Sequence, residues 1–141
     1  MISQKARYAL HALLYLTRKG QSASVAEIAG AEGLPPKFLE QVMGALKMRG
    51  IVIARRGAGG GYALARPAAE ISCAEILRAI DGPLALAPCA SQTAFRPCPD
   101  CKSLETCEIR PVLIAVRDTT ALLLEGTSLA EMAGGRKVSF L

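Results

Sequence analysis

The chain has 141 residues, enough for one compact domain or for a small domain with an appended helical arm. Hydrophobic residues make up 51% and charged residues 21%, a composition that excludes a wholly disordered chain. Ten of the 17 basic residues but only three of the 12 acidic ones lie in residues 1–66. This part therefore has a net charge of +7, and residues 67–141 have a net charge of −2. A basic half indicates a polyanion as partner, and a charge bias that only favours solubility is the alternative.

No apolar run approaches the ~20 residues that a membrane span needs, so we expect no membrane partner. Residues 1–5 lead directly into a helical pattern rather than a signal peptide, which predicts a cytoplasmic protein. In a reducing compartment the five cysteines indicate metal or redox ligands rather than structural disulfides.

Three helical patterns come first along the chain. The first spans residues 3–19 with apolar residues at helical spacing, and Gly20 ends it. The second is short and opens at Ser24, whose spacing to Glu27 is that of a capping box. After a tight glycine-containing turn, the third spans residues 36–49 and is capped by the next glycine. Two helices joined in this way predict a helix-turn-helix.

A β-hairpin is predicted next, over residues 51–65. Four of the five residues in 57–61 are glycine, which lets the backbone of the turn approach another surface closely. A helix-turn-helix followed by such a hairpin is a winged helix, so the predicted fold is mainly α with a small β-hairpin wing.

The C-terminal half begins with a second predicted capping box, Ser72 with Glu75, which starts a short helix that ends at Gly82. Residues 83–103 show no periodicity and are rich in proline and cysteine. A long helix is predicted over residues 105–125. Its apolar stripe consists of Ile109, Val112, Leu113, Val116, Thr120, Leu123 and Leu124.

A stripe of this length needs a partner, and a second copy of the chain across a two-fold axis is the predicted one. Packing back onto the chain's own N-terminal domain is the alternative. Ser128 with Glu131 caps a last short helix. Cys73 stands beside apolar residues in the helix that follows Ser72, and we interpret it as a packing residue.

The N-terminal residues of the second helix of a helix-turn-helix enter the major groove of DNA. Here these include Lys37, Glu40 and Gln41. Glutamine can pair with adenine, glutamate can accept from cytosine, and lysine can reach guanine or phosphate. We therefore predict base contacts by this group, with an ordinary solvated helix face as the alternative.

Four further basic residues are predicted to contact DNA. Arg55 and Arg56 precede the glycine-rich turn, where a guanidinium suits a narrow minor groove. They alternate faces on a strand, so we do not expect both to bind equally. Lys5 and Arg7, near the start of the first helix, are candidates for phosphate contacts.

The order of these pieces resembles the Rrf-two superfamily of winged-helix transcription regulators, in particular its iron–sulfur-sensing, IscR-like and NsrR-like branch. The resemblance covers essentially residues 2–133. It is carried by Tyr8-Ala9-Leu10, Glu27-Ile28-Ala29, Phe38-Leu39-Glu40-Gln41, the block from Arg56 through Gly59 to Tyr62, and the cysteine-rich loop before a long helix. It implies a homodimer with a long dimerisation helix, and recognition of double-stranded DNA with a palindromic operator through Glu40, Gln41, Arg56 and the wing residues Gly59 and Tyr62.

Four cysteines, Cys89, Cys98, Cys101 and Cys107, lie within nineteen positions. Thiolates are soft ligands suited to an iron–sulfur cluster or to zinc. The resemblance implies three ligands at Cys89, Cys101 and Cys107 and favours a cluster, [2Fe–2S] or [4Fe–4S], with zinc as the alternative.

The fourth ligand is where the chain departs from the family pattern. The gap after Cys89 is longer than in the family and contains an additional cysteine, Cys98. In relatives the fourth ligand can follow the third cysteine, a position held here by Arg110, which cannot ligate iron. Cys98 is the simplest candidate. His11 is the rival, because a relative uses a histidine in this part of the first helix.

Together these observations divide the chain into a winged-helix DNA-binding domain (1–82), a cysteine-rich cluster-binding loop (83–104), a dimerisation helix with a short terminal helix (105–133) and a loose tail (134–141). The predicted function is a non-enzymatic, homodimeric regulator, a repressor whose operator affinity is set by the cluster and which senses iron–sulfur status, redox conditions or nitric oxide. The alternative is the same regulator with a zinc or thiol-only redox switch. A more distant one is a thiol oxidoreductase that uses Cys98 and Cys101.

Overall fold

The structure is a computed structural model that describes residues 2–135 and 138. Its first half contains α1 (Gln4–Lys19), α2 (Val25–Glu32), α3 (Pro36–Met48), β1 (Val52–Arg55) and β2 (Gly61–Leu64). Its second half contains the short 3₁₀ helix η1 (Ala68–Glu70), α4 (Cys73–Asp81), the 3₁₀ helix η2 (Pro88–Ala90), α5 (Arg110–Glu125) and α6 (Leu129–Ala133). This architecture confirms the predicted fold class. Of the predicted tail, residues 136–137 and 139–141 lie outside the described residues.

The hydrophobic core is built mainly by the part of the chain before residue 83, which we call the DNA-binding half, and is completed by α6. Its largest fully buried side chains are Leu13, Ile28, Leu39, Met43, Leu46, Ile51, Ile71, Ile76 and Leu129, with Val42 and Val52. The Tyr8 ring of α1 meets Phe38 of α3 edge to face at 5.5 Å, which holds α3 on α1. Leu129 shows that α6 returns to this core, and its backbone N–H donates to the Ile71 carbonyl.

Serine hydroxyls cap four of the helices. Ser3, Ser24, Ser72 and Ser128 each accept the backbone N–H of the residue three positions on. Only the cap at Ser128 is the complete, reciprocal capping box. In the two other predicted boxes the glutamate does not bind the backbone N–H of the capping serine, because Glu27 binds Lys19 and Glu75 binds Arg66.

The wing hairpin is fastened to the core by its second strand. β1 and β2 pair antiparallel, with Val52 opposite Leu64. Tyr62 also exchanges two backbone hydrogen bonds with Ala23, of 2.9 and 2.8 Å. This close approach needs Gly61, where a Cβ would lie 2.1 Å from the Ala23 carbonyl oxygen.

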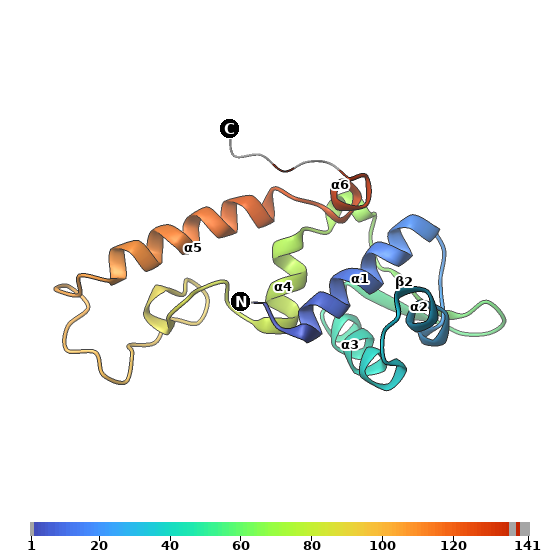
Figure 1. The fold of residues 1–141 in the computed structure, drawn as a ribbon, viewed down its shortest axis with the longest axis horizontal. Coiled ribbons are helices and arrows are strands. Elements are labelled where there is room, and N and C mark those ends of the chain that lie inside the picture. The colour runs from blue at the N-terminus through green and yellow to red at the C-terminus, as the bar shows by residue number, and fades with distance from the viewer. Residues whose placement is uncertain (1, 136–137, 139–141) are drawn as a thin grey trace.

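The segment from residue 83 to residue 126, which we call the C-terminal arm, extends away from the DNA-binding half (Figure 1). Its helix α5 has no buried residue. It starts at Arg110 and not near residue 105 as predicted, so that it equals α1 in length instead of exceeding it. Proline is preferred in the first turn of a helix, and Pro111 sets the start here.

The C-terminal end of α5 is attached to the DNA-binding half. Leu124 packs against a small cluster that includes Ala6, Leu77 and the buried Cys73, which confirms the packing role predicted for this cysteine. Arg78 of α4 pairs with Glu125 at 2.6 Å.

The segment between α4 and the cysteines starts at a second attachment point. The Asp81 carboxylate accepts the Ser3 backbone N–H at 2.8 Å and also the Ser3 hydroxyl. Among the described residues no helix is long and apolar enough to cross a membrane.

Candidate DNA-binding surface and cysteine site

The predicted base-reading residues share one exposed face of α3. Lys37, Glu40 and Gln41 are exposed, while Leu39 and Val42 between and beside them are fully buried. The buried side anchors the helix, so the exposed side is presented outward from a rigid support. This arrangement can place hydrogen-bonding groups against the edges of bases.

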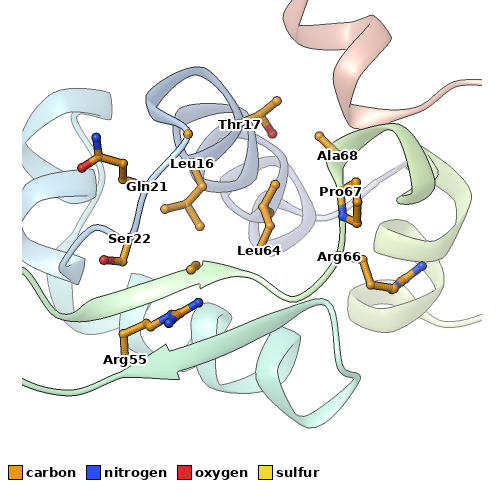
Figure 2. A pocket seen from close by; sticks show the side chains of 11 residues that line it. Leu16, Thr17, Gln21, Ser22, Arg55, Leu64, Arg66, Pro67 and Ala68 are labelled. Atoms are coloured by element: carbon orange, nitrogen blue, oxygen red, sulfur yellow. The ribbon is translucent and has the colours of Figure 1, made fainter.

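The two wing arginines are exposed and differ in their surroundings. Arg55 lines a cavity of about 440 Å³ between the end of α1 and the hairpin, with Leu16 and Leu64 on its apolar side (Figure 2). Arg66 lines it too but is bound to Glu75 of α4. Arg56 is not among the lining residues and directly precedes the glycine turn.

The remaining wing residues have identifiable partners. The Ser22 hydroxyl donates to the Gly59 carbonyl at 2.7 Å, which ties the turn to the connection between α1 and α2. Tyr62 is partly buried against the core. Both therefore position the wing, whatever contact they make with DNA.

Two residues of α1 predicted to contact phosphates and one considered as a cluster ligand are spread along that helix. Arg7 is exposed and Lys5 partly exposed near its start, as phosphate contacts require. His11, the rival fourth ligand, is 60% exposed, and its Nδ1 lies 3.6 Å from a carboxylate oxygen of Glu32 in α2. Within this chain His11 is thus turned toward α2.

The four loop cysteines all line one cavity of about 320 Å³, which Ile109 and Leu113 close on the side of α5. The Sγ atoms of Cys89 and Cys98 are 3.7 Å apart. Burial raises the pKa of the Cys89 thiol, and the hydrogen bond with Cys98 adds to this, while the Arg110 guanidinium acts in the opposite direction. The site is therefore a pocket with sulfur donors beside a cation.

Two arginines of α5 hold the backbone of the first cysteine. Arg110 Nε donates to the Cys89 carbonyl at 3.2 Å, and Arg117 Nη1 donates to the Ala90 carbonyl at 2.7 Å. Arg117 is only 15% exposed and also contacts Asp118 at 2.6 Å. Both peptide carbonyls belong to η2, so η2 is bound to one face of α5.

The donor set can be tested against the geometry of a metal site. Two thiolates bound to one tetrahedral metal ion at about 2.3 Å each lie about 3.8 Å apart. Cys89 and Cys98 are separated by 3.7 Å and fit this spacing. Among the described residues no group of three or more His, Cys, Asp or Glu side chains is already arranged around one point where a metal ion could be held. The Cys89–Cys98 pair therefore fits the spacing of two ligands on one metal ion, and Cys101 and Cys107 line the same cavity.

Comparison with known proteins decides the family. The family model described as Rrf2, an iron-dependent transcriptional regulator, matches residues 2–135. The chain belongs to the Rrf2 family. An Rrf2-like putative transcriptional regulator of Rhodobacter capsulatus is 39% identical over 137 residues, which cover 94% of this chain and 91% of the relative.

Solved structures of Rrf2 regulators agree with this fold. CymR, described as the global cysteine regulator of B. subtilis, superposes with a TM-score of 0.78 at 29% identity, and the match covers 97% of this chain and 98% of CymR. IscR of T. potens superposes with a TM-score of 0.72 at 25% identity and covers 100% of this chain and 91% of its own. The Rrf2 chain is thus a DNA-binding transcriptional regulator. Its relatives are named as regulators and not as enzymes.

Sequence reasoning about this Rrf2 chain missed the roles of Arg110 and Arg117. On the sequence alone, Arg110 is only a position that cannot ligate iron, and Arg117 has no predicted role. Each instead donates to a carbonyl about twenty or more positions away. The only available signal was two arginines seven positions apart, hence on one helical face, in a helix that follows the cysteines.

Proposed function

We propose that this chain is a homodimeric repressor whose operator affinity is set by an iron–sulfur cluster held by Cys89, Cys98, Cys101 and Cys107. The observation that carries the proposal is the convergence of these four cysteines on one cavity at the base of α5. The IscR-like relatives support a cluster in preference to other ligands. The signal would be iron–sulfur status, redox conditions or nitric oxide.

The cysteine spacing supports Cys98 as the fourth ligand. Its 3.7 Å separation from Cys89 suits two thiolates on one tetrahedral iron. All four ligands would then come from one chain, and His11 would not be needed. When bound, such a cluster supplies a redox- and nitric oxide-sensitive group whose loss changes the charge and order of the loop.

Dimerisation is supported by the exposed apolar residues of α5. Three members of the predicted stripe are exposed: Val112 is 58% exposed, Val116 39%, and Ile109 just before the helix 66%. The predicted stripe is divided, because Leu124 packs on the chain's own cluster and Leu113 lines the cysteine cavity. The exposed part fits an identical helix across a two-fold axis, which pairs with a palindromic operator.

The contacts of Arg110 and Arg117 in α5 connect the proposed cluster site with DNA binding. Because Arg110 and Arg117 hold η2, a change in the cysteine loop acts on the helix that would set the separation of the two recognition helices. In this scheme Lys37, Glu40 and Gln41 read bases, Arg56 enters the minor groove, and Lys5 and Arg7 bind phosphates. Arg55 is the weaker wing contact, since it faces the cavity beside α1.

The test is the iron, sulfide and zinc content of protein purified without oxygen, together with its absorption spectrum. We expect a coloured protein with iron and sulfide in equal amounts, and loss of both in Cys107→Ser. Cys73→Ala is the matched control, because Cys73 packs against Leu77 away from the cavity. A colourless protein with one zinc ion per chain would contradict the cluster and favour the zinc alternative.

DNA binding is measured on the same samples with duplexes selected by the wild type from a random-sequence pool. Glu40→Ala or Gln41→Ala should relax selection at particular base pairs by about 1–3 kcal/mol. A uniform loss across all positions would contradict base contacts. Comparing cluster-loaded and cluster-free protein on the selected duplex then tests whether the cluster sets the affinity.

Dimerisation is tested by sedimentation of Val116→Glu, which should shift the protein toward monomer. Met48→Glu is the control, because Met48 is 86% exposed at the end of α3 and far from α5 along the chain. Met48→Glu should sediment like the wild type. If Val116→Glu does so as well, this face of α5 is not the dimer interface.

A further inference from the structure

The cysteine cavity contains one pair of sulfur atoms in direct contact. Among the described residues, Cys89 and Cys98 are the only cysteines whose sulfur atoms hydrogen-bond to one another. We propose that, when no metal is bound, these two thiols are oxidised to an intramolecular disulfide that removes two of the four ligands and keeps the site from being reloaded. The disulfide concerns the chain alone, whereas its effect on reloading rests on the proposed function.

The geometry needs only a small movement. A disulfide has an S–S distance of about 2.05 Å, so the two sulfur atoms must approach from 3.7 Å. The Cys89 end is held, because Arg110 and Arg117 bind the carbonyls of Cys89 and Ala90. The segment around Cys98 is more exposed, so the approach comes from that side.

The exposure of the two thiols assigns their order of reaction. Cys89 is 5% exposed, whereas Cys98 is partly exposed, so a small peroxide reaches Cys98 first. The Cys98 sulfur attacks one peroxide oxygen and the O–O bond breaks, which gives a sulfenic acid and one water. The Cys89 sulfur then attacks the Cys98 sulfur and displaces the hydroxyl as a second water. Two thiols and one hydrogen peroxide thus give one disulfide and two waters.

The rival partner for Cys98 is Cys101, three positions away. The Cys101 backbone N–H donates to the Cys98 carbonyl at 3.0 Å, so a tight turn joins the two residues. Their sulfur atoms make no hydrogen bond with one another, in contrast to the Cys89–Cys98 pair. The structure therefore favours a link from Cys98 to Cys89, and Cys101 and Cys107 stay as thiols.

The first experiment treats metal-free, reduced protein with one equivalent of hydrogen peroxide and counts thiols after denaturation. The chain has five cysteines, so the count should fall from five to three, and peptide mass spectrometry should find the Cys89–Cys98 link. Cys98→Ser should begin at four thiols and stay there. Cys101→Ser is the matched control and should fall from four to two with the same link.

Three results would overturn the proposal. They are a Cys98–Cys101 link in the wild type, a link between two chains, and a loss of two thiols in Cys98→Ser equal to that in the wild type. Each is measured on the chain oxidised without any cluster, so none depends on the proposed function.

The second experiment supplies ferrous iron and sulfide to the oxidised protein before and after reduction with a phosphine. We expect loading only after reduction. Equal loading without the reductant would show that the disulfide does not keep the site from being reloaded. Failure of the fully reduced protein to load would count against the proposed cluster and would leave the disulfide result unchanged.

Discussion

The DNA-binding half and the C-terminal arm bury their apolar residues to very different extents. The half contains a closed core to which α1, α3 and α4 each contribute fully buried side chains. The arm has a 16-residue helix with no buried residue, and a cysteine cavity with only Cys89, Ala90 and Ser91 buried nearby. Burial of apolar area is the main source of stability. The DNA-binding half, completed by Leu129 of α6, therefore has a core of its own, whereas the arm has only its loop contacts and, in the proposed dimer, a second chain.

The largest difference is expected for a core truncation. Leu46→Ala removes a fully buried side chain in α3 and should lower the free energy of unfolding by about 2–5 kcal/mol, measured by urea denaturation. Val112→Ala, at a side chain 58% exposed on the predicted stripe, should lower it only through dissociation of the proposed dimer, so its effect should fade at high protein concentration. Equal losses at all concentrations would show that the arm is as self-sufficient as the half.

A smaller effect is expected where the wing joins the half. Gly61→Ala places a Cβ 2.1 Å from the Ala23 carbonyl oxygen at a φ of +138°, and should cost more than about 1 kcal/mol. Gly44→Ala, in α3 and with open space around it, should instead stabilise by up to about 1 kcal/mol. The pair is compared by thermal unfolding. A change of melting temperature in the same direction for both variants would contradict the close docking of the hairpin.

Within the arm, Arg117→Met tests whether a side-chain hydrogen bond stabilises the segment around Cys89 in the place of a hydrophobic core. It leaves the Ala90 carbonyl without its donor in a fully buried residue, a local cost of about 1–3 kcal/mol. Faster amide exchange over residues 88–91 and faster loss of iron are the expected readouts. Arg96→Met is the control, since the Arg96 side chain is exposed. Identical amide exchange in the two variants would show that Arg117 does not connect the cysteine loop to α5.

The smallest effect concerns phosphate contacts of the half. Lys5→Ala should weaken binding almost equally for all DNA sequences and reduce the slope of log affinity against log salt by about one unit. The salt series is measured by fluorescence anisotropy on the selected duplex. An unchanged slope would place Lys5 outside the interface.

The sequence was informative where structure depends on neighbouring residues. Gly20 and the serine caps set helix ends through local hydrogen bonds, and the ends predicted from them agree with the structure to within about a residue. Helical spacing alone predicts a start of α5 near residue 105, but Pro111, which marks a first helical turn, places the start at Arg110.

Long-range hydrogen bonds were not predictable in the same way. Glu27 and Glu75 have the spacing of capping boxes, yet their carboxylates bind Lys19 and Arg66 instead. The contact of Cys98 with Cys89 and the hold of Arg117 on Ala90 depend on how the loop folds back on α5, and no periodic pattern encodes that path. The cysteine ligand set stays a prediction for the same reason.

The bond from Ser3 to Asp81 has a consequence for the order of folding. Ser3 caps the first turn of α1, but its backbone N–H and hydroxyl both donate to a residue 78 positions later. Contacts between residues so distant along the chain form late, because a long loop must close first. The first turn of α1, which contains Lys5, would therefore gain this long-range bond only after α4 has formed, although its serine cap is local. On a growing chain the predicted phosphate-binding end would lack the bond until residue 81 has left the ribosome.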